Sequence, residues 1–460
     1  MSGKPVNILW ALAVTLGVTV AVVVGVLAAP RSAITPSRIS PVTNSKETAA
    51  TPAPTAQVAE VTVKTAEATA VVASSGTKPD NAATRPAATT PPAAAVEPPP
   101  RPVPPIVPPI PAAPAAWPSE RGTADLSGAV ATALPPQLEK RWTWEAGSSV
   151  ASSVAISDGA VFVATSKGVL ARLDLVTGKP VWTTPAVAAG YGVAPLVANG
   201  AVFVGDSAGT LHAIEAATGT KRWTVELGGN VIISANAAGD AVLVCTEANQ
   251  LKCLAAADGK ERWAFTADQY IRSIPCVVGK EAIIAGCDGV LRALAIADGK
   301  ERFLASAKNF GTGVARLGDA VYIGAVEGDV MSVALDDGKI RWSLSGDMGK
   351  VTMPAAVCPT AVLFAGEDGQ VAALDPKDGK ALWKIRPGEG AATAPVIAGQ
   401  EWWIGDSAGT LHRLELATGK LIWAWKAGGS LSGGVAIVGE WLVIGTGDGA
   451  VHAFTRTAAK

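Results

Sequence analysis

Three histidines are the residues best suited to metal or acid–base chemistry, and all three occupy the same position of a repeated pattern. They are His212, His412 and His452. A shared position in successive repeats can place ligands in a ring, and zinc binds imidazole nitrogens at about 2.0–2.1 Å. However, the corresponding position in the other repeats holds Ala171, Lys252, Arg292, Met331 and Ala372. We therefore predict ordinary strand residues here, and neither a metal site nor histidine catalysis.

Cysteines and glycine-rich segments also lack the spacing of known reactive motifs. No C-x-x-C pair occurs among Cys245, Cys253, Cys276, Cys287 and Cys358, so neither a thioredoxin-type site nor haem attachment is predicted. Their odd number excludes complete pairing and leaves two alternatives open, buried free thiols or a single disulfide. The GDSAGT segments at 205–210 and 405–410 lack the lysine of a phosphate-binding loop. The sequence therefore assigns no catalytic, cofactor-binding or metal-binding residue.

The elements that carry these residues repeat about every forty positions. A pattern of Thr or Asp, Gly, three variable residues and an aromatic residue occurs seven times. Its glycines are Gly178, Gly219, Gly259, Gly299, Gly338, Gly379 and Gly419. Its aromatic residues are Trp182, Trp223, Trp263, Phe303, Trp342, Trp383 and Trp423, at spacings of 39–41 residues, and Trp142 lies 40 residues before the first. We expect the aromatic side chain to pack between neighbouring repeats.

Each repeat contains four short apolar segments separated by glycine turns. In the second repeat, the segments AVFVG and TLHAIE are followed by a Thr-Gly turn and then by a strand that carries Trp223. Four antiparallel strands per 40–45 residues are typical of a β-propeller blade. The eighth repeat lacks its fourth strand, and the segment around Trp142 supplies that strand from the other end of the domain. The sequence thus predicts an all-β, eight-bladed propeller over residues 134–460 that is closed by an N-terminal strand.

The repeat resembles the PQQ-like, or quinoprotein-type, propeller repeat, and the domain is similar to the BamB family. The likeness covers residues 138–460 and is marked at 405–412 (GDSAGTLH) and 448–456 (DGAVHAFTR). This resemblance implies a non-catalytic scaffold that binds other envelope proteins, including the β-barrel assembly machine, with no cofactor. A ligand-sensing or small-molecule-binding ectodomain is the alternative function.

A quinoprotein dehydrogenase fits the sequence less well. Enzymes of that kind are larger, have long inserted loops around the cofactor, and place two adjacent cysteines against the quinone. They also need a Ca²⁺ site made of oxygen ligands. In this chain most aspartates fall on the repeating turns, as Asp258 and Asp298 do, where the carboxylate bonds to local backbone. We therefore expect no enzymatic activity.

The N-terminal third has two zones that precede the propeller. Residues 8–29 are almost continuously apolar, long enough to cross a bilayer as a helix, so residues 1–30 are predicted to be a signal anchor, with a cleaved signal peptide as the alternative. Residues 31–133 are rich in Pro, Ala and Thr and are predicted to be a disordered linker. This order predicts a single-pass protein of the bacterial inner membrane with its propeller in the periplasm.

Surface residues give the remaining predictions about partners. The formal net charge is -1, which argues against nucleic-acid binding. Arg272, Arg316 and Lys350 lie near the starts of three inner strands and are candidates for binding at one mouth of the channel. Two tryptophan segments, at 402–403 and 441, form either a partner surface or part of the packing between blades. We expect a monomeric propeller.

Overall fold

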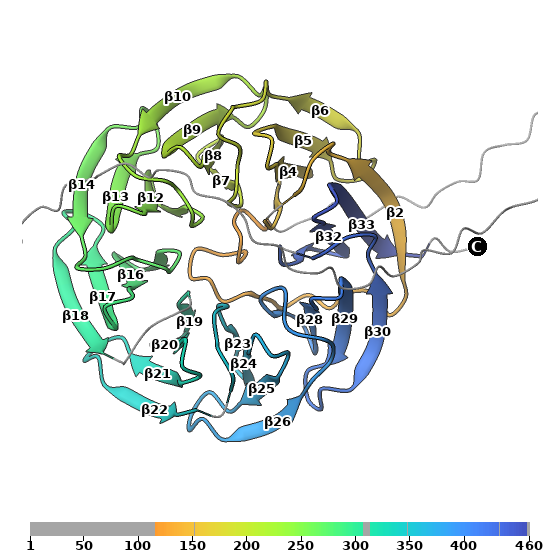
Figure 1. Cartoon of the computed structure of the whole chain (residues 1–460). Coiled ribbons are helices and arrows are strands. Elements are labelled where there is room, and N and C mark those ends of the chain that lie inside the picture. Colours follow the sequence, from red (N-terminus) through yellow and green to blue (C-terminus); the bar gives the residue numbers. More distant parts are fainter. Residues whose placement is uncertain (1–115, 151, 307–312, 347, 432, 458–460) are drawn as a thin grey trace, which may run out of the picture. The chain divides into compact units, whose positions relative to one another are not determined.

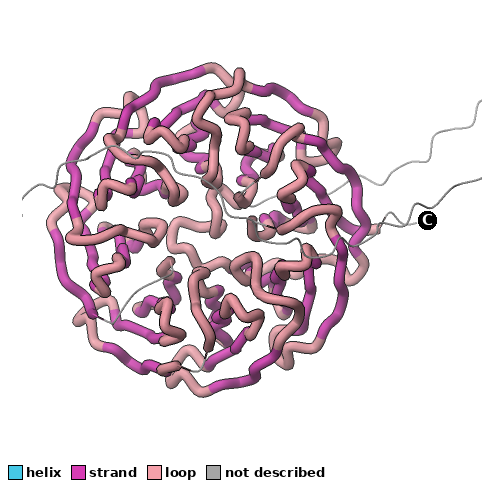
Figure 2. The backbone as a smooth tube through the Cα atoms, viewed as in Figure 1, coloured by secondary structure: helices cyan, strands magenta, loops and turns pink. Residues whose placement is uncertain are grey.

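The structure, a computed structural model, describes residues 116–150, 152–306, 313–346, 348–431 and 433–457. This part of the chain contains strands and loops only (Figure 2). None of these residues lies in a helix that is long and apolar enough to cross a membrane. The predicted signal anchor (1–30) and linker residues 31–115 lie outside the described residues.

The strands form eight sheets that surround a central axis, and each sheet is one blade (Figure 1). Blades 1–4 consist of β3 (Ala155–Ser157), β4 (Ala160–Ala164), β5 (Leu170–Asp174), β6 (Pro180–Thr183); β7 (Leu196–Ala198), β8 (Ala201–Gly205), β9 (Thr210–Glu215), β10 (Lys221–Glu226); β11 (Asn236–Ala238), β12 (Ala241–Thr246), β13 (Gln250–Ala255), β14 (Glu261–Thr266); and β15 (Cys276–Val278), β16 (Glu281–Ala285), β17 (Val290–Ala295), β18 (Glu301–Ser306). Blades 5–7 consist of β19 (Ala315–Leu317), β20 (Ala320–Gly324), β21 (Val330–Ala334), β22 (Ile340–Leu344); β23 (Ala356–Cys358), β24 (Ala361–Ala365), β25 (Val371–Leu374), β26 (Ala381–Ile385); and β27 (Val396–Ala398), β28 (Glu401–Gly405), β29 (Thr410–Glu415), β30 (Leu421–Lys426). The predicted eight-bladed, all-β architecture is confirmed.

Blade 8 is built from both ends of the domain. Its first three strands are β31 (Ala436–Val438), β32 (Trp441–Gly445) and β33 (Ala450–Arg456), and its outer strand is β2 (Leu138–Glu145). Strand β2 pairs antiparallel with β33, and the two lie side by side in Figure 1, as an orange and a blue arrow. This pairing closes the ring, because the N-terminal strand supplies the fourth strand that the last repeat lacks.

The second strand of each blade forms the core between neighbouring blades. In β4, β8 and β20 every residue is buried. Both faces of such a strand pack against apolar side chains, so its sequence is continuously apolar and does not alternate. The outer strands alternate between exposed and partly buried residues, as β10 and β14 do. Each blade therefore buries its centre and exposes one face of its outer strand to solvent.

The repeat aromatic and the repeat glycine of the next blade meet at one joint. The Trp263 indole Nε1–H donates a hydrogen bond to the carbonyl of Ile296 in blade 4, at 2.8 Å. A Cβ atom on Gly299 would lie 2.7 Å from the Trp263 ring. Equivalent hydrogen bonds to the next blade are made by Trp142, Trp182, Trp223, Trp342 and Trp383. All seven repeat glycines have φ between 69° and 75°.

Phe303 does not occupy the position expected for a repeat aromatic. Its side chain is 59% exposed, whereas the neighbouring Leu304 is 4% exposed and belongs to the core. In other blades the bulge of the outer strand precedes the tryptophan, as at 221–223. In blade 4 the pairing moves from Arg292–Phe303 to Leu291–Ala305, so Leu304 is the bulge residue. This shift turns Phe303 outward.

Residues 116–133, which we expected to be part of the linker, pack against the blades instead. Trp117 and Leu126 are fully buried, and β1 (Ala129–Val130) adds a parallel strand to the inner edge of β27 in blade 7. The propeller unit therefore includes residues on the N-terminal side of the expected boundary at 134. We call residues 117–130 the inner lap.

The inner lap contacts the blades in their order around the ring. Trp117 exchanges two backbone hydrogen bonds with Ile156 of blade 1. Carbonyls further along the lap then accept hydrogen bonds from the middle residue of later inner strands, namely Val197, Val277, Arg316, Val357 and Ile397 of blades 2, 4, 5, 6 and 7. An inner strand has an open edge toward the channel, and unpaired backbone groups there need partners. The lap supplies them.

Candidate functional site

Two of the three predicted channel-mouth residues lie at the same cavity. Arg272 and Lys350 both line a cavity of about 530 Å³, together with Ile232, Val326 and Glu367. Both cations are exposed. They precede the inner strands β15 and β23, so they lie on the face of the propeller at which the inner strands begin. We call this the upper face.

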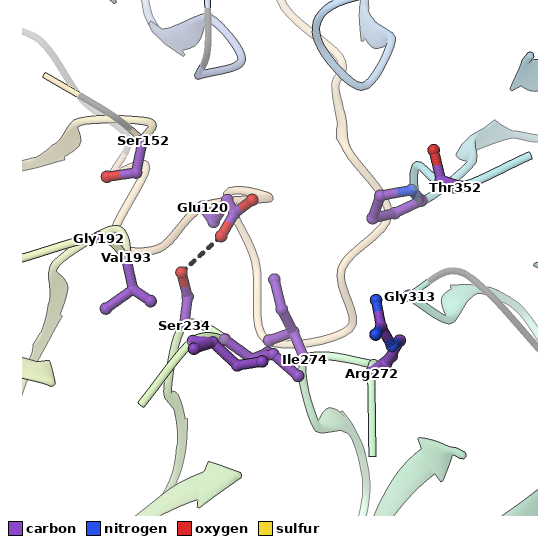
Figure 3. Close-up of a pocket in the computed structure, with 12 residues that line it drawn as sticks. Glu120, Ser152, Gly192, Val193, Ser234, Arg272, Ile274, Gly313 and Thr352 are labelled. Atoms are coloured by element: carbon purple, nitrogen blue, oxygen red, sulfur yellow. Dashed lines mark hydrogen bonds between the residues drawn. The ribbon is translucent and has the colours of Figure 1, made fainter. Parts of the chain in front are cut away.

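The floor of the upper mouth comes from the inner lap. A second cavity, of about 220 Å³, shares Ile232 and Arg272 with the first and is also lined by Glu120 and Ser234. The Ser234 hydroxyl of blade 3 donates a hydrogen bond to the Glu120 carboxylate at 2.5 Å (Figure 3). The upper mouth therefore combines two exposed cations with a carboxylate that is bonded to the wall of the channel.

Arg316, the third predicted channel-mouth residue, does not line the cavities of the upper mouth. Its Nε donates to the carbonyl of Gly318, and its Nη1 lies 3.9 Å from the Asp125 carboxylate. It lines a third cavity, which does not include Arg272 or Lys350. Arg316 is the middle residue of β19, whereas Arg272 and Lys350 precede their strands. A strand advances about 3.3 Å per residue, so a shift of a few residues along an inner strand moves a side chain from one end of the channel toward the other.

The third cavity is an apolar groove on the opposite, lower face. It has a volume of about 520 Å³ and lies beside the hairpins that follow the inner strands of blades 5–7. Its lining includes Val130, Leu317, Val357, Pro359 and Ile397. The groove therefore has an apolar wall that is built partly by the inner lap.

Ion pairs cover the outer part of the lower face on blades 3 to 5. The residue before the repeat aromatic there is an arginine, and it binds an acidic residue near the first hairpin of its own blade. The pairs are Arg262–Asp240, Arg302–Glu281 and Arg341–Asp319, at 2.6–2.7 Å. Charged side chains at a strand edge hinder pairing with other chains.

Blades 6 and 7 lack these ion pairs. The position before the repeat aromatic holds Leu382 and Ile422, which are 50% and 47% exposed, and Leu421 is 52% exposed. The hairpin position of Asp240 and Asp319 holds Thr360 in blade 6 and Gln400 in blade 7, both of which line the apolar groove. Glu401 of blade 7 has the position of Glu281, but it pairs with Arg413. Leu382, Leu421 and Ile422 are therefore exposed apolar side chains on the outer strands β26 and β30, and we call these three residues the apolar band.

The three histidines lie in three different blades and make separate local contacts. The Nε2 atoms of His212 and His412 lie 2.8 Å from the carboxylates of Asp206 and Asp406, which also cap the adjacent turns. His452 bonds to the Thr143 hydroxyl at 3.0 Å. Burial, with a smaller contribution from the charge of Lys140, lowers the pKa of His452 to about 4. The described residues include no group of three or more His, Cys, Asp or Glu side chains arranged to hold a metal ion.

The tryptophan segments named as a candidate partner surface are buried. Trp402 and Trp403 are 0% exposed and Trp441 is 2% exposed, since all three lie on second strands. They therefore belong to the packing between blades. Each of the five cysteines is a free thiol, and burial raises the pKa of Cys245 and Cys276 well above its usual range.

Two buried arginines were missed by the sequence analysis. Arg121 of the inner lap is 2% exposed and donates to the carbonyl of Ala355 at 2.8 Å. Arg413 is 1% exposed, pairs with Glu401, and donates to the carbonyls of residues 134–136. Arg413 follows the His412 position of the repeat, where the first repeat also has an arginine, Arg172, and the other repeats have Ala, Cys or Ser, so a long cation at a position of mostly small residues was an available signal. Arg121 had no such signal, because it precedes the repeats.

Comparison with known proteins places the fold and the family. A family profile described as "Outer membrane protein assembly factor BamB" matches residues 127–235, 209–357 and 327–460. The structure is similar to BamB from Moraxella catarrhalis, with a TM-score of 0.61 and 20% identity over 70% of this chain and 100% of that chain. The computationally designed Ika8 protein gives a TM-score of 0.61 and 16% identity over 69% of this chain and 100% of that chain.

An enzyme shares the fold as well. Quinohemoprotein alcohol dehydrogenase from Comamonas testosteroni has a TM-score of 0.62 and 13% identity over 75% of this chain and 82% of that chain. At these identities the structural likenesses establish a common fold only. No curated protein sequence matches the chain. The family profile, however, covers most of the chain, and the protein therefore belongs to the family described as outer membrane protein assembly factor BamB.

Proposed function

We propose that this protein is a non-catalytic scaffold of the bacterial cell envelope that binds a partner protein through the lower face of blades 6 and 7. The apolar band and its groove carry this proposal. Leu382, Leu421 and Ile422 are each about half exposed, and they belong to the two blades whose hairpin residues Thr360 and Gln400 line a groove of about 520 Å³. Exposed apolar surface that is bordered by polar residues is typical of protein interfaces.

The borders of this surface favour one defined docking area. On one side, blade 5 carries the Arg341–Asp319 ion pair. On the other side, blade 8 carries the Arg456–Glu440 ion pair. The positions that hold Leu382 and Ile422 in blades 6 and 7 thus hold arginines in blades 3 to 5, although single exposed apolar residues also occur on other outer strands, such as Ile340 of blade 5 and Val181 of blade 1. An apolar centre with a charged rim gives both affinity and a fixed orientation to a bound partner.

The proposed partners are proteins that assemble the outer membrane, including components of the β-barrel assembly machine. The family description supports this class of partner.

For location, we propose a single-pass protein of the inner membrane whose propeller lies in the periplasm. The apolar segment at 8–29 and the proline-rich segment after it support that arrangement.

A quinone-dependent oxidation is not part of this proposal, although dehydrogenases share the fold. The inner strands of blades 1, 2, 4, 5, 6 and 7 bond their middle amides to the inner lap. The chain's own residues thus line the channel that the blades surround. This feature supports a scaffold whose partner contacts the lower face of the blades.

The experiment that tests the scaffold function is cross-linking of the full-length protein in native envelope membranes, followed by identification of the captured partners. The informative variant combines Leu382→Arg with Ile422→Arg. It gives blades 6 and 7 an arginine before the repeat aromatic, as blades 3 to 5 have. Val181→Arg is the matched control, because Val181 holds the same position of blade 1 and is 53% exposed.

We expect outer-membrane assembly proteins among the partners of the unmodified protein, and at least about tenfold less of them with the double variant, since a buried interface does not tolerate two unpaired charges. The control variant should capture normal amounts. The proposal fails if capture is equal with the double variant and the unmodified protein, or if no envelope protein is enriched over a chain that lacks residues 116–460.

A further inference from the structure

Arg121 is a buried cation whose charge has no ion-pair partner among the described residues. Its side chain is 2% exposed, and Nη2 donates to the carbonyl of Ala355 at 2.8 Å. Its Nε is buried and has no acceptor in the described part of the chain. Burial lowers the pKa of Arg121 to about 10, and the nearby charge of Glu120 acts against this shift. A buried guanidinium normally has a carboxylate or another anion as its partner.

The carboxylate of Glu120 does not fill this role. Glu120 is bonded to Ser234 of blade 3, whereas Arg121 is bonded to Ala355 of blade 6. The two side chains of this adjacent pair therefore reach different blades. In Figure 3 the Glu120 carboxylate points toward Ser234. The arrangement leaves the guanidinium in need of a negative group from another source.

A cavity lies directly against Arg121. Its volume is about 300 Å³, and its lining includes Glu120, Arg121, Thr352 and Thr393. The Thr393 Oγ1 accepts a hydrogen bond from the Gly405 amide at 2.8 Å, so its hydroxyl proton remains for a ligand. The cavity is thus lined by two groups that donate hydrogen bonds to an anion, and its volume is at the lower end of small-molecule sites.

This cavity is connected to the upper mouth through shared lining residues. Thr352 lines all three cavities of the upper face. Arg272 lines the two outer ones, of about 220 and 530 Å³. Lys350 lines the outermost and largest of them. Two exposed cations at the entrance therefore lead to a buried cation at the floor. The carboxylates of Glu120 and Glu367 line the same cavities, so three cations and two carboxylates leave an excess of one positive charge. Excess positive charge in a hollow attracts and concentrates anions.

We propose that the upper mouth is a binding site for a small organic anion whose carboxylate or phosphate group is held by Arg121 and Thr393. The planar guanidinium donates parallel hydrogen bonds that match both head groups. Arg272 and Lys350 draw the anion into the mouth and bind any second acidic group that it carries. This site lies on the face opposite to the apolar band, so it does not depend on the scaffold function.

Calorimetric titration of the full-length protein tests the site. The probes are succinate for carboxylates and glycerol 3-phosphate for phosphates, with succinamide as the uncharged counterpart. We expect one of the two anions, or both, to bind with one-to-one stoichiometry, and succinamide not to bind. The anion that binds more tightly identifies the head group. The proposal would be overturned if neither anion bound at a probe concentration of about 10 mM, which is high enough to detect weak ligands.

Two variants locate the anion. Arg121→Met should weaken binding about 100-fold, since a charge-assisted bidentate contact is lost. Because this variant alters a buried residue, the exposed pair Arg272→Glu and Lys350→Glu serves as a second variant that leaves the core intact, and it should weaken binding about tenfold. Arg316→Glu, on the other side of the channel, is the control and should bind as the unmodified protein does. Equal affinity in all three variants would refute the assignment of this site.

Discussion

The joint between a repeat tryptophan and the glycine of the next blade gives a quantitative prediction. Gly299 has a φ of 71°, and an added Cβ would lie 2.7 Å from Cδ2 and Cε3 of Trp263. Gly279 of the same blade has a φ of 59°, but an added Cβ would meet no atom within 4 Å. Gly279→Ala therefore measures the backbone cost alone, about 1–2 kcal/mol for a left-handed alanine. Gly299→Ala adds an overpacking cost of about 1–3 kcal/mol.

Urea unfolding of the full chain, followed by circular dichroism, gives the free energy of unfolding of each variant. We expect Gly299→Ala to be less stable than Gly279→Ala by the overpacking cost. Trp263→Leu should remove this difference, since the smaller side chain leaves room for the new methyl group, so the double variant should show a coupling energy of about 1–3 kcal/mol. The close contact between Trp263 and Gly299 would be refuted if the two glycine variants lost equal free energy of unfolding. It would also be refuted if the extra loss of Gly299→Ala persisted in the Trp263→Leu background.

Three further predictions concern other parts of the ring. Arg413→Met should cost about 3–5 kcal/mol in unfolding free energy, because it leaves the Glu401 carboxylate and the 134–136 carbonyls without their donor, and a cost near zero would contradict this. Phe303→Ala should change stability by less than about 0.5 kcal/mol, whereas Leu304→Ala should cost about 2–5 kcal/mol; the reverse order would show that the aromatic is the core residue. Burial holds the pKa of His452 at about 4, below its unfolded value, so stability should be complete above about pH 6.5 and decline by about 1–2 kcal/mol as the pH falls toward 4. His452→Gln should remove that pH dependence, as measured by thermal unfolding at several pH values.

The repeat was sufficient to predict the blades and the closure of the ring. Its spacing, the four apolar segments per unit, and the missing strand of the last repeat all follow from local residue types. Pairing of β2 with β33 needed no structural information, because Trp142 stands one repeat length before Trp182. The match to the BamB family follows from the same repeat.

The inner lap was not predictable by the same reasoning. Residues 116–133 show no regular alternation and directly follow a proline-rich stretch, so their composition resembles a linker. They are held largely by backbone carbonyls that accept hydrogen bonds from the inner strands. Every residue type carries a carbonyl group, so sequence gives little indication of such contacts. The buried site at Arg121 was missed for the same reason.

Side-chain positions depend on details finer than the repeat. Phe303 matches the aromatic position in sequence, but a displaced bulge turns it toward solvent. Arg316 is near Arg272 and Lys350 in the repeat numbering, yet a shift of a few residues along a strand places it at another cavity. Trp402 is fully buried although it is polar at one edge of its ring. Register along the strand decides the first two cases, and the place of Trp402 on a second strand decides the third.

The way in which the ring is closed sets an order of events for synthesis. The inner lap and β2 are made first, before any blade exists, and their partners appear one after another as the chain grows. Strand β2 pairs with β33, so its partner leaves the ribosome only after the strands of blades 1–7. Contacts between such distant segments form slowly, because a long loop must close first. A chain that stops before β33 leaves β2 without its partner, and the last blade can form only after all the other blades have been synthesised.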